Sequence, residues 1–72
     1  MSLRMNDKLL RSIMVLHDDT NAKLAECLKI SPQRFSAKLN ETSGTEFTQS
    51  EIKMIRNRYN LSDVEVVAIF FA

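Results

Sequence analysis

The chain has 72 residues, of which 44% are hydrophobic, and it contains one glycine and one proline. This length fits a single domain, in which about 60% of the surface of the unfolded chain can be buried. The composition argues against a disordered chain and favours a compact, mostly helical fold. The formal net charge is only +1, so overall charge alone does not indicate a nucleic-acid partner.

The composition also bears on the compartment in which the protein works. The single cysteine, Cys27, has no partner for an internal disulfide, which favours a reducing cytoplasm and a core or half-buried thiol. No apolar run approaches the roughly 18 residues that span a bilayer, and the N-terminus lacks a secretory apolar segment. We therefore expect a soluble, cytoplasmic protein.

The first predicted helix begins at Asn6 or Asp7 and ends near His17. Its apolar residues recur at helical spacing and form a broad buried side. These residues are Leu9, Leu10, Ile13, Met14 and Leu16. Residues 1–5 contain a second methionine and are interpreted as a tail or a remnant of expression. The domain itself is therefore expected to span residues 6–72.

A short second helix is predicted to follow Thr20, whose hydroxyl suits an N-cap. Leu24, Ala25 and Leu28 have the one-sided spacing of an amphipathic helix. The segment is long enough for about two turns.

A third helix begins almost at once. Ser31 supplies a side-chain oxygen for its N-cap, and Pro32 occupies the first helical position, where its missing N–H and fixed φ carry no penalty. Lys29 and Ile30 must therefore turn the chain sharply, with Ile30 filling the corner between the helices. Two short helices joined by a tight turn are the outline of a helix-turn-helix that reads DNA.

The outward side of this third helix, residues 32–40, carries no acidic group. At about 100° per residue, Phe35 and Leu39 lie on the buried side. The opposite and flanking positions are occupied by Gln33, Arg34, Ser36, Ala37, Lys38 and Asn40. Their side chains present the polar, cationic and methyl groups that contact base edges and phosphates.

Individual side chains on this face suggest individual bases. Arg34 can pair bidentately with guanine, Gln33 can pair with adenine, and Ala37 can contact the methyl group of thymine. The alternative interpretation is an ordinary solvated face of a small helical domain.

These residues also carry a resemblance to a known family. The pattern consists of Asn21…Leu24-Ala25…Leu28…Ile30-Ser31…Phe35-Ser36-Ala37-Lys38-Leu39-Asn40. It resembles the phage-repressor and Cro-like helix-turn-helix regulators, also called the xenobiotic-response-element type. Residues 47–62 look like the next helices of small prophage members, so the likeness covers roughly residues 6–71. The resemblance implies an all-α, compact five-helix, lambda-repressor-like DNA-binding domain.

The resemblance also implies roles for single residues. Asn21, at the start of the first helix of the motif, would contact a phosphate. The positions that usually face the major groove are occupied by Pro32, Gln33, Arg34, Ser36 and Ala37. Lys29 stands where the family usually has glycine. We therefore expect either a positive φ at Lys29, at a cost of about 1 kcal/mol, or a different turn.

Together these observations give one set of candidate DNA-binding residues. The set comprises Asn21, Lys23, Ser31, Pro32, Gln33, Arg34, Ser36, Ala37, Lys38 and Asn40. Residues 20–40 carry four cations against one acid, Glu26, a local excess of three positive charges. The polar loop that follows contains Ser43, Gly44 and Thr45, which are interpreted either as phosphate contacts or as an ordinary connector.

Two further helices are predicted from local signals. Thr48 and Glu51 have the spacing of a capping box, and Asn60 can end that helix in the left-handed region. Ser62 and Glu65 repeat the capping box directly afterwards. Both helices therefore have well-defined starts.

The last helix is apolar over most of its circumference, which is unusual for a helix that is solvated on one side. It is expected either to be wedged into this small domain or to form a homodimer. The proposed dimer residues are Val66, Val67, Ile69, Phe70 and Phe71. In a dimer the two copies of the third helix, residues 32–40, would enter successive major grooves about 34 Å apart on a pseudo-palindromic site.

The sequence offers little support for catalysis. It has no paired-carboxylate signal, no glycine-rich phosphate loop and no spaced metal ligands, and His17 is interpreted as part of a solvated helix end. We expect no enzyme and no cofactor. The leading hypothesis is a transcriptional regulator that binds a double-stranded DNA operator and blocks polymerase. The alternative is a helical protein-interaction module or antitoxin-like partner that uses the apolar C-terminal helix.

Overall fold

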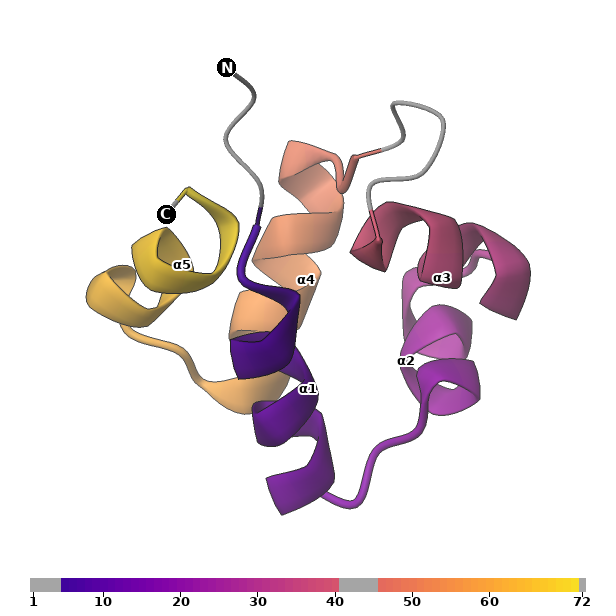
Figure 1. Cartoon of the computed structure of the whole chain (residues 1–72), viewed down its shortest axis with the longest axis horizontal. Coiled ribbons are helices and arrows are strands. Elements are labelled where there is room, and N and C mark those ends of the chain that lie inside the picture. The colour runs from indigo at the N-terminus through magenta and orange to yellow at the C-terminus, as the bar shows by residue number, and fades with distance from the viewer. Residues whose placement is uncertain (1–4, 41–45, 72) are drawn as a thin grey trace.

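The computed structural model describes residues 5–40 and 46–71. Within these residues the chain forms five α-helices and no strand (Figure 1). The helices are α1 (Asp7–Leu16), α2 (Asn21–Leu28), α3 (Pro32–Leu39), α4 (Gln49–Tyr59) and α5 (Asp63–Phe70). The predicted all-α class and the five predicted helices are confirmed.

All five helices begin at a residue whose side-chain oxygen accepts a hydrogen bond from the backbone N–H three residues later. These N-caps are Asn6, Thr20, Ser31, Thr48 and Ser62. The carboxylates of Glu51 and Glu65 accept hydrogen bonds from the backbone N–H groups of their N-cap residues at 2.8 and 2.9 Å. Both predicted capping boxes are therefore confirmed. Each cap pairs a backbone N–H that the helix itself leaves without an acceptor. Such a cap contributes about 1 kcal/mol to the free energy of unfolding.

Three helices end at a left-handed residue that is not glycine. These residues are Asp18, Lys29 and Asn60, with φ values of 55°, 60° and 52°. In each case the next residue donates its N–H to a carbonyl five residues back, at 2.8 to 3.0 Å. This bond is the one that defines the Schellman motif. Of the two alternatives for Lys29, the structure has the positive φ, and the expected left-handed ending at Asn60 is confirmed.

The core is a single cluster to which every helix contributes. Its largest fully buried side chains are Phe35, Leu10, Leu24, Leu39, Ile55 and Ile69. The ring of Phe47, just before α4, lies 5.7 Å from the ring of Phe35 and 6.0 Å from that of Phe70. The first pair of rings is tilted and the second is edge-to-face, and aromatic packing at such distances adds to the stabilisation from burial. These aromatic contacts join α3, the start of α4 and α5.

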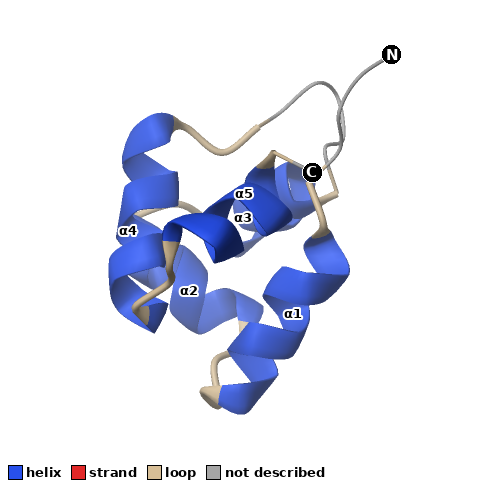
Figure 2. Ribbon diagram, turned by 90° about the vertical axis from the view of Figure 1, so that its left-hand side faces the viewer, coloured by secondary structure: helices blue, strands red, loops and turns tan. Residues whose placement is uncertain are grey.

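The helices place α3 and α5 at opposite ends of the molecule. In Figure 1, α3 lies at the right and α5 at the left, with α1 and α4 between them. In Figure 2, turned by 90°, α3 and α5 overlap along the line of sight while α1 and α4 flank them. The domain measures 33 × 27 × 20 Å. A partner on the outer side of α5 therefore leaves α3 accessible.

The structure corrects two sequence interpretations near the termini. Met5, assigned to the tail, is half-buried and packs against the core, and the N–H of Asn6 donates to the Ile69 carbonyl at 2.6 Å. The domain therefore includes Met5. Val66 and Ile69, two of the proposed dimer residues, are buried inside the monomer because their side of α5 faces the core.

No helix within residues 5–40 and 46–71 has both the length and the apolar character needed to cross a membrane. The longest, α4, has 11 residues, whereas a span needs about 20.

Candidate nucleic-acid interface

The chain bends sharply between α2 and α3, as the sequence predicts. Lys29 adopts the left-handed conformation, and the N–H of Ile30 closes the end of α2 on the Ala25 carbonyl at 3.0 Å. Ile30 is half-buried against the core. The hydroxyl of Ser31 then accepts the N–H of Arg34 at 3.1 Å and begins α3. The result is two helices of eight residues each, joined by a short turn and packed on each other.

The first turn of α3 is exposed to solvent. Pro32, Gln33 and Arg34 are all exposed, whereas Phe35 and Leu39 are buried as expected. Ser36 and Ala37 are half-buried one turn further on. The exposed side of α3 therefore presents an amide and a guanidinium at its N-terminal end, where the helix dipole also favours a phosphate.

Lys38 was wrongly assigned to this exposed face. Its residue is only 4% exposed, and its ammonium lies 2.7 Å from Oε1 of Glu51 and 3.2 Å from the Glu46 carbonyl. The position lies three residues after Phe35, which places it beside the buried side of the helix. The flexible side chain of Lys38 can therefore reach α4, and it is not available to a phosphate.

The ion pair with Lys38 sets the ionisation of Glu51. Burial alone would raise the pKa of Glu51, but the hydrogen bonds from Lys38 and from the Thr48 backbone outweigh it and lower that pKa. A buried charge pair offsets the cost of its desolvation only when both partners are fully hydrogen-bonded. Its structural effect is to fix α3 against the start of α4.

Asn40 follows α3 and is held by a residue from another helix. Its Oδ1 accepts a hydrogen bond from the Arg11 guanidinium at 3.1 Å, and its Nδ2 lies 3.5 Å from Oγ of Ser36. Arg11 also contacts Asp7 at 3.3 Å. Sequence reasoning missed Arg11, because α1 carries it on a polar face with no local sign of a partner 29 residues away.

The remaining charges on the motif are mostly solvated. Arg34 and Lys29 are exposed, and Lys23 is exposed with its ammonium 3.4 Å from the Asp18 carbonyl. With Lys38 neutralised by Glu51, these three cations face one acid, Glu26, on residues 20–40. The solvent-exposed excess is therefore two positive charges rather than three. Asn21, the first residue of α2, is exposed on the same motif.

A network around Asp19 fixes the start of α2. Both carboxylate oxygens accept hydrogen bonds from Arg58 at 2.7 and 2.8 Å, and the Tyr59 hydroxyl donates a third at 2.7 Å. The Arg58 bond, the largest cause, lowers the pKa of Asp19 to about 2 despite burial. Burial, followed by the bond to Asp19, raises the pKa of Tyr59. The turn before α2 is thereby attached to the end of α4.

His17, interpreted as part of a solvated helix end, is exposed. The ring of His17 lies 4.9 Å from the ring of Tyr59, in a packing contact. Across residues 5–40 and 46–71, His, Cys, Asp and Glu side chains form no group that could hold a metal ion. Ser43, Gly44 and Thr45, the proposed loop contacts, lie outside the described residues.

No family model, no curated protein and no solved structure matches this chain.

Proposed function

We propose that this protein is a sequence-specific regulator that binds double-stranded DNA and occupies an operator, in the manner of the repressor and Cro-like proteins that its sequence resembles. The observation that carries the proposal is the exposed, acid-free first turn of α3. This turn consists of three solvent-exposed residues, Pro32, Gln33 and Arg34, and it directly follows the sharp bend of the chain. A helix presented in this way fits a major groove.

The proposed interface comprises side chains from both helices of the motif. Gln33 and Arg34 contact base edges, while Asn21, Lys23 and Asn40 contact phosphates. The rest of the proposed interface contacts the duplex through its shape and consists of Ser31, Pro32, Ser36 and Ala37. The proposal includes no catalytic step and no cofactor, and it places the protein in a reducing cytoplasm, which the lone thiol of Cys27 favours.

Selection from random duplexes at moderate salt tests this function. The protein should enrich a defined motif, and its affinity for that motif should fall steeply with salt, by about 0.9 in log K per log salt for each phosphate neutralised. Enrichment without a preferred motif would contradict sequence-specific reading. Failure to bind any duplex, even at low salt, would overturn the proposal.

A homodimer on a pseudo-palindromic site is part of the proposal. Two copies of α3 about 34 Å apart would contact successive major grooves on one face of the duplex. Selected sites should then show two inverted half-sites with a fixed spacing. A single, asymmetric half-site would point to binding as a monomer.

One observation favours a second candidate, a helical protein-interaction module. Val64, Val67 and Phe71 remain exposed along α5, at 78%, 55% and 52%. An apolar stripe of this kind is typical of a surface that contacts protein. The two functions differ in their response to salt and DNA, because a pure interaction module would bind no duplex and show no counterion release.

A further inference from the structure

Two hollows beside α4 and the end of α5 adjoin each other. The larger has a volume of about 800 Å³ and the smaller a volume of about 430 Å³. Each volume falls within the range of roughly 300–1,000 Å³ that small-molecule sites occupy. Gln49, Ile52 and Phe71 line both hollows. The two hollows therefore form one continuous site with two differently lined ends.

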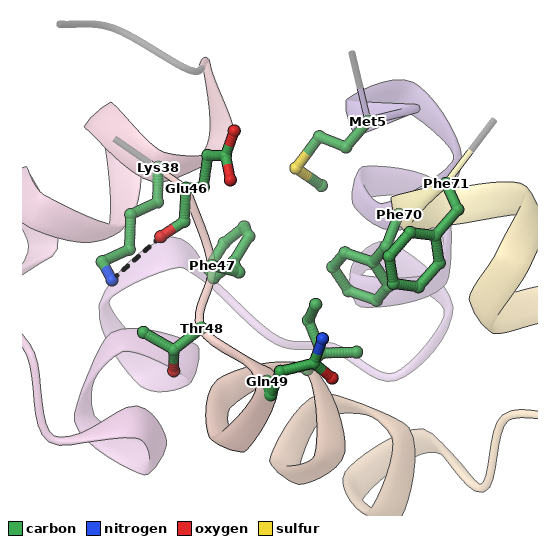
Figure 3. Close-up of a pocket in the computed structure, with 9 residues that line it drawn as sticks. Met5, Lys38, Glu46, Phe47, Thr48, Gln49, Phe70 and Phe71 are labelled. Atoms are coloured by element: carbon green, nitrogen blue, oxygen red, sulfur yellow. Dashed lines mark hydrogen bonds between the residues drawn. The ribbon is translucent and has the colours of Figure 1, made fainter. Parts of the chain in front are cut away.

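The smaller hollow has aromatic walls, and we call it the aromatic hollow. Figure 3 shows Phe70 and Phe71 across this hollow from Phe47. The rings of Phe47 and Phe70 already pack edge to face at 6.0 Å, whereas Phe71 is 52% exposed. An exposed ring at the junction of the two hollows offers a surface on which a flat aromatic group can stack.

Polar side chains of the aromatic hollow can recognise the edge of such a group. The exposed Glu46 lies at its upper edge in Figure 3, and Gln49 lies at its base. A carboxylate accepts hydrogen bonds from an amino group, and a side-chain amide both donates and accepts them. Lys38 also lines this hollow, but Glu51 balances its charge. The aromatic hollow therefore suits an uncharged aromatic ring that carries an amino group.

The larger hollow is basic, and we call it the basic hollow. Its lining in the described parts of the chain includes Lys53 and Arg56 and no carboxylate. Because they are three residues apart on α4, these cations are neighbours on the helix surface, with Cβ atoms about 5–6 Å apart. Arg56 pairs with the exposed Asp63 at 2.6 Å, whereas Lys53 makes no ion pair within residues 5–40 and 46–71. Two adjacent cations suit a group with several negative charges, such as a diphosphate.

We propose that the two hollows together bind a purine nucleoside diphosphate. The purine stacks on Phe71 in the aromatic hollow, and its amino group donates to the Glu46 carboxylate. The diphosphate contacts Lys53 and Arg56 in the basic hollow, and Gln49, at the junction, contacts the ribose. No exposed residue of α2 or α3 lines either hollow. This site is therefore separate from the proposed DNA-binding face.

The lining of the site comes from three parts of the fold. Lys38 belongs to α3, Gln49 and Lys53 belong to α4, and Phe71 follows α5. These residues come together only in the folded chain. A ligand that binds the folded chain alone stabilises it by mass action, so ADP should raise the midpoint of thermal unfolding as its concentration rises.

Calorimetric titration of the full chain with ADP, in a buffer without divalent cations, tests the site. We expect one ADP or GDP to bind per chain with a dissociation constant below about 1 mM. Pyrophosphate lacks the base and adenosine lacks the phosphates, so each should bind at least about tenfold more weakly. UDP should also bind more weakly, because uracil has a smaller ring and no amino group. No binding of ADP at millimolar concentrations, or equal binding of ADP and pyrophosphate, would overturn the proposal.

Two variants test the two ends of the site. Lys53→Gln should weaken ADP binding about tenfold, because it removes a charged contact to the diphosphate. Lys8→Gln is its matched control, since it removes an exposed cation from α1, which lines neither hollow. Phe71→Leu keeps an apolar side chain but removes the ring, so it should weaken ADP by a larger factor than pyrophosphate. Equal losses in Lys53→Gln and Lys8→Gln would show that only net charge matters, which would contradict the proposed contact.

A change at Asp63 has the opposite expected sign. Asp63 holds the Arg56 guanidinium, so Asp63→Asn frees that group and removes a negative charge near the diphosphate. ADP should then bind severalfold more tightly. Asp7→Asn removes the corresponding partner of Arg11 on α1 and should leave the affinity for ADP unchanged. An unchanged or lower affinity in Asp63→Asn would refute the contact between Arg56 and the diphosphate.

Amide NMR spectra recorded during the titration locate the bound nucleotide. The largest chemical-shift changes should fall at Gln49, Lys53 and Phe71. Changes centred instead on Gln33 and Arg34 would mean that ADP occupies the proposed DNA-binding face, and the assignment of the two hollows would be wrong. Binding of duplex DNA is measured separately on the same variants, so failure of the nucleotide site and failure of the proposed function are distinguishable.

Discussion

The ammonium of Lys38 lies 2.7 Å from a carboxylate oxygen of Glu51, and this ion pair joins α3 to α4 in the interior of the domain. The same Glu51 oxygen accepts the Thr48 N–H of the capping box. One carboxylate thus begins α4 and holds the proposed recognition helix against it. The ion pair therefore helps to fix the position of α3 relative to α4.

Removing one partner of this pair should be strongly destabilising. Lys38→Met leaves the Glu51 charge buried with fewer donors, so the free energy of unfolding should fall by about 3 kcal/mol. Glu51→Gln should be costly for the same reason, because it strands the ammonium. Urea denaturation followed by circular dichroism gives the measurement. The double variant Lys38→Met/Glu51→Gln removes both charges and should be more stable than Lys38→Met alone; a strictly additive loss would contradict the coupling.

The Asp19 network predicts a specific loss of stability in acid. The pKa of Asp19 in the folded protein is about 2, below the ordinary value of 3.8. Asp19 therefore contributes stability that is present above about pH 4 and lost as the pH falls towards 2. Asp19→Asn should lower the free energy of unfolding by about 1–3 kcal/mol at pH 7, with a difference that shrinks steadily below pH 4.

The control for this acid transition is Glu26→Gln, which changes an exposed carboxylate that makes no ion pair within the described parts of the chain. Unfolding free energies measured from pH 2 to pH 7 should show the wild-type acid dependence for this variant. If Asp19→Asn kept the same dependence as well, another carboxylate would be responsible for it.

Helix ends were predictable because their signals are local. The N-caps at Thr20 and Ser31 and the left-handed ends at Lys29 and Asn60 depend on residues within one turn of each other. The burial of Lys38 was not predictable in this way. Its partner lies 13 residues further on and in another helix, and the capping-box role of Glu51 gave no sign of a second contact. A helical projection alone places Lys38 at the boundary of the exposed face.

The contacts of Arg11 and Asp19 were likewise not predictable from the local sequence. Their partners, Asn40 and Arg58, lie 29 and 39 residues away, and only tertiary packing brings them together. The hydrophobic pattern of α5 predicts a helix with little solvated surface, but one side of α5 is exposed in the structure. This pattern does not separate the core side of α5 from its exposed side, because apolar residues occupy both sides. The resemblance gave the motif, while the structure decided which side chains are exposed.

The strained turn of the motif offers a stabilising substitution. Lys29 has a φ of 60°, a conformation that costs a residue with a Cβ roughly 1–2 kcal/mol. Lys29→Gly should raise the free energy of unfolding by about 1 kcal/mol, after the greater flexibility of glycine in the unfolded chain is included. Glu26→Gly, in the interior of α2, is the control and should be destabilising by a similar amount. A loss of stability in both variants would show that the turn is unstrained.

The proposed interface makes a distinct prediction for each of its cations. Arg34→Ala removes a guanidinium that is exposed at the start of α3. On a selected operator it should cost about 1–3 kcal/mol and relax the preference at one base pair. Lys23→Ala should instead weaken all sequences alike and reduce the salt slope by about one phosphate. Competition binding with single-base variants of the operator separates these two results.

Lys38 provides the internal control for these DNA measurements, because its ammonium is buried against Glu51. A cation that contacts no phosphate releases no counterion, so Lys38→Met should leave the salt slope of the remaining folded protein unchanged. Any loss of affinity should follow the folded fraction, which denaturation at the same temperature measures. A reduced salt slope in Lys38→Met would show that Lys38 leaves Glu51 for the DNA backbone. An unchanged operator preference in Arg34→Ala would remove the assignment of α3 as the reading helix.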